Sequence, residues 1–600
     1  MGQLSRKAAI VGVDESNEIG IDSYRPAIMG TTHMVSAGHY LATAAGYRML
    51  EEGGNAVDAG VASGIAINVL LPESTNFGGV APIMVYLAAS DSVVTISGLG
   101  RWPRAASIDY YMSNAGGEIP RGILRSVLPS AADAWLTALE RYGTMTFEQV
   151  VAPARELAGN GYPMSPVVHA GLTHNSESLA MWPSTRKIFM PDGRVPGTGE
   201  LFVQKDLART FERLVEVELA NVHRGREAAI RAARDYFYKG DMAREMASFS
   251  QEQGGLITYQ DLHDFSVKIE EPVKGRFRDY TIYTCGPWCQ GPVVAQVLQM
   301  LEDDDLSAMG HNSPDYLHLV SQALDVAFSD RHHYYGDPDF VDVPIEGLLS
   351  KGYTRARRQD IDMARAFGQM PQPGNPWPFQ NQRSKGQPSG APTSVELTPV
   401  SGDHQEDTSY TCVVDRWGNA FSATPSDPVS ESPVVPGLGF IMSGRGYQSW
   451  LEPDHPSSLQ PWKRPRLTPN PAIAFKNGKL FMPFGCPGGD AQPQGMVQLF
   501  LNIAAFGMDP QKAIEQPRIT TWNFPNSFWP HTYLPGRLRV EGRIPRETVD
   551  ELARRGHDIE VVEDWSRTFM SSLSSIVVDQ ESGMLMGGAD PRRDTYVMGR

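Results

Sequence analysis

The sequence has few cysteines and a deficit of positive charge, and each shortage disfavours a class of protein. Only four of its 600 residues are cysteines, at 285, 289, 412 and 486, and their spacing is not that of metal ligands. Such low usage is typical of a reducing compartment. The chain carries 53 basic and 69 acidic residues, a net charge of −16. This balance disfavours a nucleic acid or an anionic membrane as partner, because both need a basic surface.

Long apolar runs are also missing. No stretch approaches the roughly 18 uninterrupted apolar residues of a membrane span. The apolar run at residues 8–13 is too short for a signal peptide. Hydrophobic residues make up 41% of the chain and charged residues 20%, which is ordinary for a globular protein with a large core. We therefore expect a cytoplasmic protein with neither a membrane nor a nucleic-acid partner.

The periodicity of apolar residues changes along the chain. Before residue 370 helical spacing dominates, with strands expected within 83–97. Residues 371–406 are rich in Pro, Gln, Gly and Ser and predict a flexible loop. After this segment the period becomes two, which predicts two hairpins. Helices are expected near 40–50, 58–71, 131–142, 147–158 and 315–328, one hairpin from 408–415 and 420–424, and a second around Asn477-Gly478.

Thr408 opens the first of these strands directly after the Pro/Gln-rich segment. A threonine hydroxyl is a poor nucleophile unless a base lies beside it. A free α-amino group on the same residue can be that base, because its pKa is about 7.7–8.0. Cleavage of the Asp407–Thr408 bond would create such a chain end, and an exposed loop upstream favours cleavage there. A buried strand residue is the plainer interpretation of a lone threonine.

Six segments in order carry a resemblance to a known family. The segments are Gly53-Gly54-Asn55-Ala56-Val57-Asp58-Ala59, Asn76-Phe77-Gly78-Gly79, Ala327–Arg331 with Tyr335–Pro338, Lys463-Arg464-Pro465, Pro487-Gly488-Gly489 and Ala589–Arg592. Together they resemble the γ-glutamyltransferase family of N-terminal-nucleophile (Ntn) hydrolases, from about residue 30 to the C-terminus. The fold this implies is α+β, a four-layer αββα sandwich.

The resemblance implies a precursor that cuts itself at Asp407–Thr408. The large chain 1–407, with its flexible segment 371–406, and the small chain 408–600 would then form one Ntn unit, with a higher oligomer possible. Thr408 would be the nucleophile, and the backbone N–H groups of Gly488 and Gly489 the oxyanion hole. Ser426 stands where the family has a second threonine that orients the nucleophile; a surface hydroxyl is the alternative for it. Neither a metal nor an organic cofactor is implied.

The sequence departs from the family where a glutamyl substrate would be held. Leu99 stands in place of an arginine that binds the substrate α-carboxylate, and Gln448 in place of an aspartate that binds the α-amino group. Thr468 replaces a serine. Hydrogen bonds to charged groups contribute about 1.5–3 kcal/mol each, so losing the first two contacts would weaken recognition about 10²–10⁴-fold.

The predicted function is therefore a self-processing amidohydrolase or acylase that acts on a small-molecule amide, with an acyl group other than a standard γ-glutamyl. Arg101, Trp102 and Arg445 are candidate pocket residues, although a surface arginine paired with a carboxylate is the plainer interpretation of each arginine. Two alternatives stay open. One is a γ-glutamyl transpeptidase or glutathione hydrolase, and the other is an unprocessed, non-catalytic binding protein.

Overall fold

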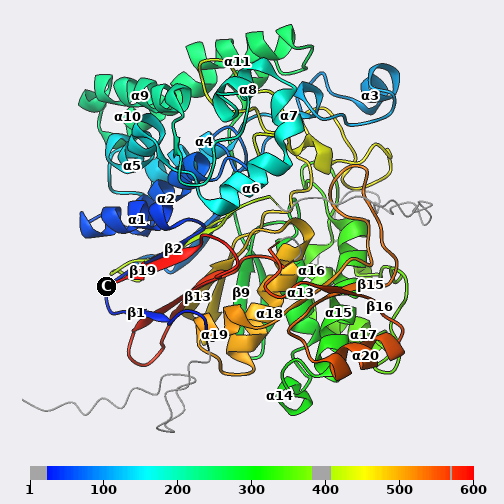
Figure 1. Ribbon diagram of the computed structural model, residues 1–600. Coiled ribbons are helices and arrows are strands. Elements are labelled where there is room, and N and C mark those ends of the chain that lie inside the picture. The colour runs from blue at the N-terminus through cyan, green and yellow to red at the C-terminus, as the bar shows by residue number, and fades with distance from the viewer. Residues whose placement is uncertain (1–22, 381–406, 568–569) are drawn as a thin grey trace, which may run out of the picture.

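The computed structural model describes residues 23–380, 407–567 and 570–600. The apolar run at 8–13 and residues 381–406 of the expected flexible segment lie outside the described residues. Figure 1 shows helices above and below a pair of stacked sheets, with the C-terminus beside β1 and β19.

Two seven-stranded antiparallel sheets form the centre of the molecule (Figure 1). The first has the order β19 (Tyr596–Gly599), β2 (Met34–Ala37), β10 (Thr411–Val414), β11 (Ala420–Ala423), β3 (Ile83–Leu87), β4 (Ser92–Ile96) and β7 (Ile269–Glu270). The second has the order β1 (Ile28–Gly30), β18 (Leu585–Ala589), β17 (Ser574–Val578), β13 (Lys479–Gly485), β12 (Ala472–Lys476), β9 (Tyr280–Thr284) and β8 (Val273–Phe277).

Helices cover the outer face of each sheet and bury it in a separate apolar core. A third core lies between the sheets and includes Cys412 and Ile473. On the first sheet lie α1 (Tyr40–Glu51) and α2 (Ala56–Leu70); α4 (Ala131–Tyr142) and α5 (Phe147–Asn160) pack on α2, and α9 (Lys205–Ala220) and α10 (Arg226–Lys239) pack on these. On the second lie α13 (Gly291–Met300), α18 (Gln492–Ala504) and α19 (Pro510–Glu515), and α15 (Pro314–Tyr334) packs on α13. The expected αββα sandwich is confirmed.

Smaller elements complete the fold. A three-stranded sheet of β14 (Ile519–Thr521), β15 (Arg537–Glu541) and β16 (Asp558–Val562) packs with α20 (Arg546–Arg554), and β5 (Tyr162–Pro163) pairs with β6 (Leu201–Phe202). The other α-helices are α3 (Ile108–Asn114), α6 (Pro166–His174), α7 (Ser176–Ala180), α8 (Pro183–Phe189), α11 (Asp241–Glu252), α12 (Tyr259–Asp264), α14 (Leu306–Met309), α16 (Ile345–Leu348) and α17 (Lys351–Gln359).

Both expected hairpins are present. In the first, Val414 of β10 pairs with Ala420 of β11. In the second, β12 and β13 are joined at Asn477 and Gly478, whose φ angles are +50° and +77°. Positive φ at both central residues is the geometry of a type I′ turn, which matches the twist of the flanking strands.

The first ten residues of the segment 371–406 are hydrogen-bonded to neighbouring helices. The hydroxyl of Tyr334 donates to the carbonyl oxygen of Gly374 at 2.6 Å, and Gly374 N–H donates to Asp330 Oδ1 at 3.0 Å. Arg357 of α17 donates to the carbonyl of Gln372 at 2.9 Å. Composition predicted a loop here because the partners that satisfy this backbone come from α15 and α17, outside the segment.

Candidate active site

Thr408 lies just before β10, a central strand of the first sheet, and its side chain is fully buried. Its backbone N–H donates to the carbonyl oxygen of Ser74 at 3.1 Å. Its φ is +96°, a conformation that favours glycine and that a β-branched residue rarely adopts. Such a backbone costs about 1–3 kcal/mol. Strain is therefore located at the residue whose preceding peptide bond is the expected cleavage site.

The hydroxyl of Thr408 contacts two oxygen atoms. Its Oγ1 is 2.6 Å from Ser426 Oγ, and it donates to Asp407 Oδ1 at 3.0 Å. Ser426 is fully buried and its N–H donates to the carbonyl of Val80 at 2.9 Å, so it is not a surface hydroxyl. Ser426 and the Asp407 carboxylate thus orient the Thr408 hydroxyl.

The glycine turn faces the carbonyl of Asp407. Gly488 N–H donates to the Asp407 carbonyl oxygen at 3.4 Å. The φ angles of Gly488 and Gly489 are +122° and +52°, which other residues adopt only with strain. Gly489 begins a short 3₁₀-helix, Gly489–Ala491, that leads into α18, and N–H groups at a helix start favour negative charge. The carbonyl that Thr408 would attack therefore lies against a donor of the predicted oxyanion hole.

Arg445 lies at the centre of this cluster and is fully buried. Its Nη2 atom donates to Asp407 Oδ2 at 2.6 Å and also to Ser426 Oγ. The hydroxyl of Tyr447 donates to the same Asp407 oxygen at 3.3 Å. Burial alone would lower the pKa of Arg445, but the Asp407 carboxylate holds that pKa above its ordinary value. Burial raises the pKa of Asp427, on the other side of the guanidinium, to about 7.

Gln448 and Thr468 are brought together beside the glycine turn. Gln448 Nε2 donates to Thr468 Oγ1 at 2.9 Å. Gln290 Nε2 donates to the carbonyl oxygens of Thr468 at 3.0 Å and of Gly489 at 2.7 Å, and so joins the pair to the turn. Gln448 Oε1 is buried and has no hydrogen-bond partner among the described residues.

Leu99, Arg101 and Trp102 do not line the two cavities that reach Thr408 or Asp407. Arg101 is paired with Asp339 at 2.7 Å and with Asp337 at 3.4 Å. Trp102 is buried in an apolar cluster and Leu99 in the core between the sheets. The side chains of Arg101 and Trp102 are thus engaged elsewhere in the framework, and their role in the pocket stays a prediction.

Residues of three further motifs shared with the family form buried ion pairs near the glycine turn. Arg331 forms a buried ion pair with Asp490, which directly follows the glycine turn, and donates to Gln290 Oε1 at 2.7 Å. Arg464 forms a buried ion pair with Asp337 at 2.8 Å. These residues hold segments from both proposed chains together around the turn.

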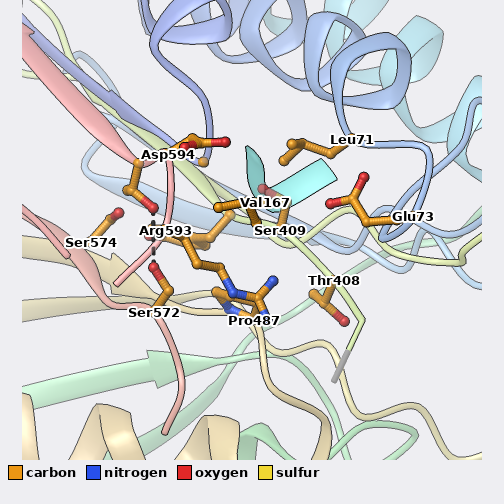
Figure 2. Close-up of a pocket in the computed structure, with 13 residues that line it drawn as sticks. Leu71, Glu73, Val167, Thr408, Ser409, Pro487, Ser572, Ser574, Arg593 and Asp594 are labelled. Carbon is orange, nitrogen blue, oxygen red and sulfur yellow. Dashed lines mark hydrogen bonds between the residues drawn. The ribbon is translucent and has the colours of Figure 1, made fainter. Parts of the chain in front are cut away.

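Glu73 was missed by sequence reasoning. It lines both a pocket of about 10 Å³ with Thr408 and a polar cavity of about 340 Å³ with Asp407. Figure 2 shows Glu73 and Thr408 around the smaller pocket, with Arg593 beside them. Burial raises the pKa of Glu73 to about 7. The one sequence signal was a carboxyl residue three positions after the end of a long apolar helix.

The larger cavity is lined by charged groups that were also not anticipated. Arg121 and Arg125 both form ion pairs with Glu431. Although burial raises the pKa of Glu431, these guanidinium groups hold it below its ordinary value. Tyr447 belongs to the same wall, and the Arg125 guanidinium lies 5.0 Å from its ring centre.

The four-layer fold with this site defines the class of N-terminal-nucleophile hydrolases. A profile of the family Gamma-glutamyltranspeptidase matches residues 42–600. The chain belongs to the gamma-glutamyltranspeptidase family.

Three relatives illustrate the likeness. The Glutathione hydrolase-like YwrD proenzyme of Bacillus subtilis (strain 168) is 34% identical, over 96% of this chain and 99% of the relative. The Acylase ACY 1 proenzyme of a Pseudomonas species is 31% identical, over 88% of each. The crystal structure of cephalosporin acylase from Bacillus halodurans matches with a TM-score of 0.82 and 28% identity, over 98% of this chain and 99% of that one. These findings confirm the expected family, fold and hydrolase class.

Proposed function

We propose that this chain cleaves itself at Asp407–Thr408 and then hydrolyses a small-molecule amide, with Thr408 as the nucleophile. The arrangement around one bond carries the proposal. Thr408 Oγ1 is held by Ser426 and Asp407, while the carbonyl of Asp407 lies against Gly488 N–H. The names of two relatives, a glutathione hydrolase-like proenzyme and an acylase proenzyme, support the same reaction class.

Self-cleavage begins with attack by Thr408 Oγ1 on the Asp407 carbonyl carbon. Before cleavage Thr408 has no free amine, so another group must accept the hydroxyl proton; the Asp407 carboxylate, 3.0 Å away, is suited to this. The oxygen–carbon bond forms, the carbon–nitrogen bond breaks, and the nitrogen takes a proton. Water then hydrolyses the ester. The strained φ of Thr408 favours the first step, because the ester releases the backbone.

In turnover the new α-amino group of Thr408 becomes the base for its own hydroxyl. Its nitrogen is placed by the carbonyl of Ser74, at 3.1 Å before cleavage. Gly488 N–H and the adjacent Gly489 N–H stabilise the charge on the substrate carbonyl oxygen. The amine leaves, and water releases the acyl group.

The acyl group in this proposal is not a standard γ-glutamyl, because Leu99 and Gln448 cannot supply the family's two charged contacts. A γ-glutamyl transpeptidase or glutathione hydrolase is the alternative, and the relative from Bacillus subtilis favours it by name. Turnover of a γ-glutamyl anilide at ordinary efficiency would decide for the alternative.

A cytoplasmic location is also proposed, from the low cysteine usage. Among the described helices none has both the length and the hydropathy to cross a membrane.

The decisive experiment is intact-mass analysis of purified wild-type protein and Thr408→Ala during incubation. The wild type should give fragments 1–407 and 408–600, and Thr408→Ala should stay at 65.9 kDa. A wild-type chain that stays whole after long incubation would refute the proposal and favour a non-catalytic binding protein. Cleavage of Thr408→Ala at the wild-type rate would remove Thr408 as the nucleophile.

A further inference from the structure

Asp407 has two polar ends, and both are bound in the site. Its backbone carbonyl lies against Gly488 N–H at 3.4 Å. Its side-chain carboxylate is bound by Arg445 at 2.6 Å and by Tyr447 at 3.3 Å. One aspartyl residue therefore bridges the glycine turn and the guanidinium, with its backbone carbonyl hydrogen-bonded to the first and its carboxylate to the second.

Cleavage leaves Arg445 with the Ser426 hydroxyl but without a fixed carboxylate at hydrogen-bond distance. Asp407 is then the free end of the large chain and is no longer held covalently beside Thr408. Arg445 is fully buried, and a buried charge that loses its partner is strongly unfavourable. Asp427 Oδ2 is 3.9 Å from Arg445 Nε, too far for a hydrogen bond. The mature site therefore favours an anion that reaches Arg445 from the acyl position.

We propose that the substrate acyl group is a short dicarboxylic chain of the succinyl type, whose far carboxylate replaces the Asp407 side chain on Arg445 and Tyr447. This inference rests on the proposed function, and it names the substrate class of that same site. The reacting carbonyl takes the position of the Asp407 carbonyl against Gly488. Two carbon atoms separate carbonyl and carboxylate in both groups, so the precursor is the first substrate of its own site.

The reaction balances as a simple hydrolysis. Thr408 Oγ1 forms an ester with the succinyl carbonyl, and the amide carbon–nitrogen bond breaks as the amine takes the proton. Water then cleaves the ester, and the products are succinate, the free amine and the restored Thr408 hydroxyl. No oxidant or further reactant is needed.

Chain length and charge give an order of substrates. A butyryl amide has the same length without the carboxylate and leaves Arg445 unpaired. A glutaryl amide is one carbon longer and must bend to reach both ends. We expect kcat/KM to fall from succinyl to glutaryl, and to be about 10- to 100-fold lower for butyryl than for succinyl, which corresponds to one hydrogen-bonded charge pair.

The first test uses processed wild-type enzyme and the p-nitroanilides of succinate, glutarate and butyrate. A butyryl amide hydrolysed as well as the succinyl amide would overturn the inference and leave the proposed function standing. If no amide is hydrolysed and the chain is never cleaved, the proposed function itself fails.

In Arg445→Gln the preference for succinyl over butyryl should be lost. Arg194→Gln is the matched control, because Arg194 is an exposed arginine paired with Glu200 on the surface.

A second test does not depend on turnover or on whether Arg445→Gln matures. Succinate should raise the melting temperature of processed wild-type protein, and butyrate at the same concentration and ionic strength should not. The unprocessed Thr408→Ala protein should not respond to succinate, because Asp407 still binds Arg445. An equal response of the processed and unprocessed proteins, or none in either, would overturn the inference.

Discussion

Replacing Ser426 by alanine should slow self-cleavage while leaving the fold intact. Ser426 Oγ is 2.6 Å from Thr408 Oγ1 and accepts a hydrogen bond from the buried Arg445. A hydrogen bond to a charged group contributes about 1.5–3 kcal/mol. If that contribution is realised in the transition state, the rate should fall about 10- to 150-fold. Ser426→Thr keeps the hydroxyl and should cleave within a few-fold of the wild type.

The measurement is the fraction of intact chain over time by mass spectrometry, with circular dichroism to compare the folds. Cleavage of Ser426→Ala at the wild-type rate would refute the reasoning, since the Ser426 hydroxyl would then not position Thr408. If Ser426→Thr failed as completely as Ser426→Ala, the effect would come from the shape of the side chain rather than its hydroxyl.

Two further predictions concern the oxyanion hole and the partly buried carboxyl group of Glu73. Gly488→Ala should slow self-cleavage about 10²–10³-fold in the same mass assay. Alanine does not readily adopt the φ of +122° found at Gly488, so the backbone would shift and displace the N–H donor. An unchanged cleavage rate would exclude this N–H group from the oxyanion hole. The pKa of Glu73 is raised to about 7, so the folded state holds a proton that the unfolded chain releases above about 4.3. Stability should therefore fall as pH rises across that window, by about 3 kcal/mol between pH 5 and pH 8. The free energy of unfolding is measured with denaturant at several pH values, in Thr408→Ala protein with and without the further substitution Glu73→Gln. Glu73→Gln should remove this contribution to the fall in stability with pH. The same pH dependence in both proteins would contradict the prediction.

Local sequence signals were sufficient for the elements that carry the nucleophile. The alternation after residue 408 and the Asn477-Gly478 turn predicted both hairpins, because strand period and turn chemistry are properties of neighbouring residues. The helix 131–142 was likewise found with the expected bounds. The αββα sandwich came only from the family resemblance, and the order of strands in the two sheets was not predicted, since pairing between distant segments leaves no local periodic signal.

The partners of charged residues could not be predicted from the sequence. Arg101 was expected in the pocket, yet it pairs with Asp337 and Asp339, more than 200 residues away. Arg445 was one of three candidate pocket residues, and only the fold shows that it forms an ion pair with Asp407. Glu73 gave no functional signal, because its place in the site depends on two cavities that only the fold creates, both of which it lines. Long-range pairing decides which of these charges belong to the site.

Strands from both sides of the Asp407–Thr408 bond alternate in the two sheets, and this affects how the protein folds and unfolds. In the first sheet β2 lies between β19 and β10, and β11 pairs with β3; in the second, β1 pairs with β18 and β9 with β12. Each of these ladders joins the segment before the proposed cut to the segment after it. One broken bond therefore frees neither piece, but it changes how the protein must fold. The precursor folds as a single chain, whereas a matured molecule that unfolds must find its other half by diffusion. After self-cleavage, the two chains of an unfolded molecule no longer refold as one polypeptide. The lifetime of the mature form therefore depends on its unfolding rate.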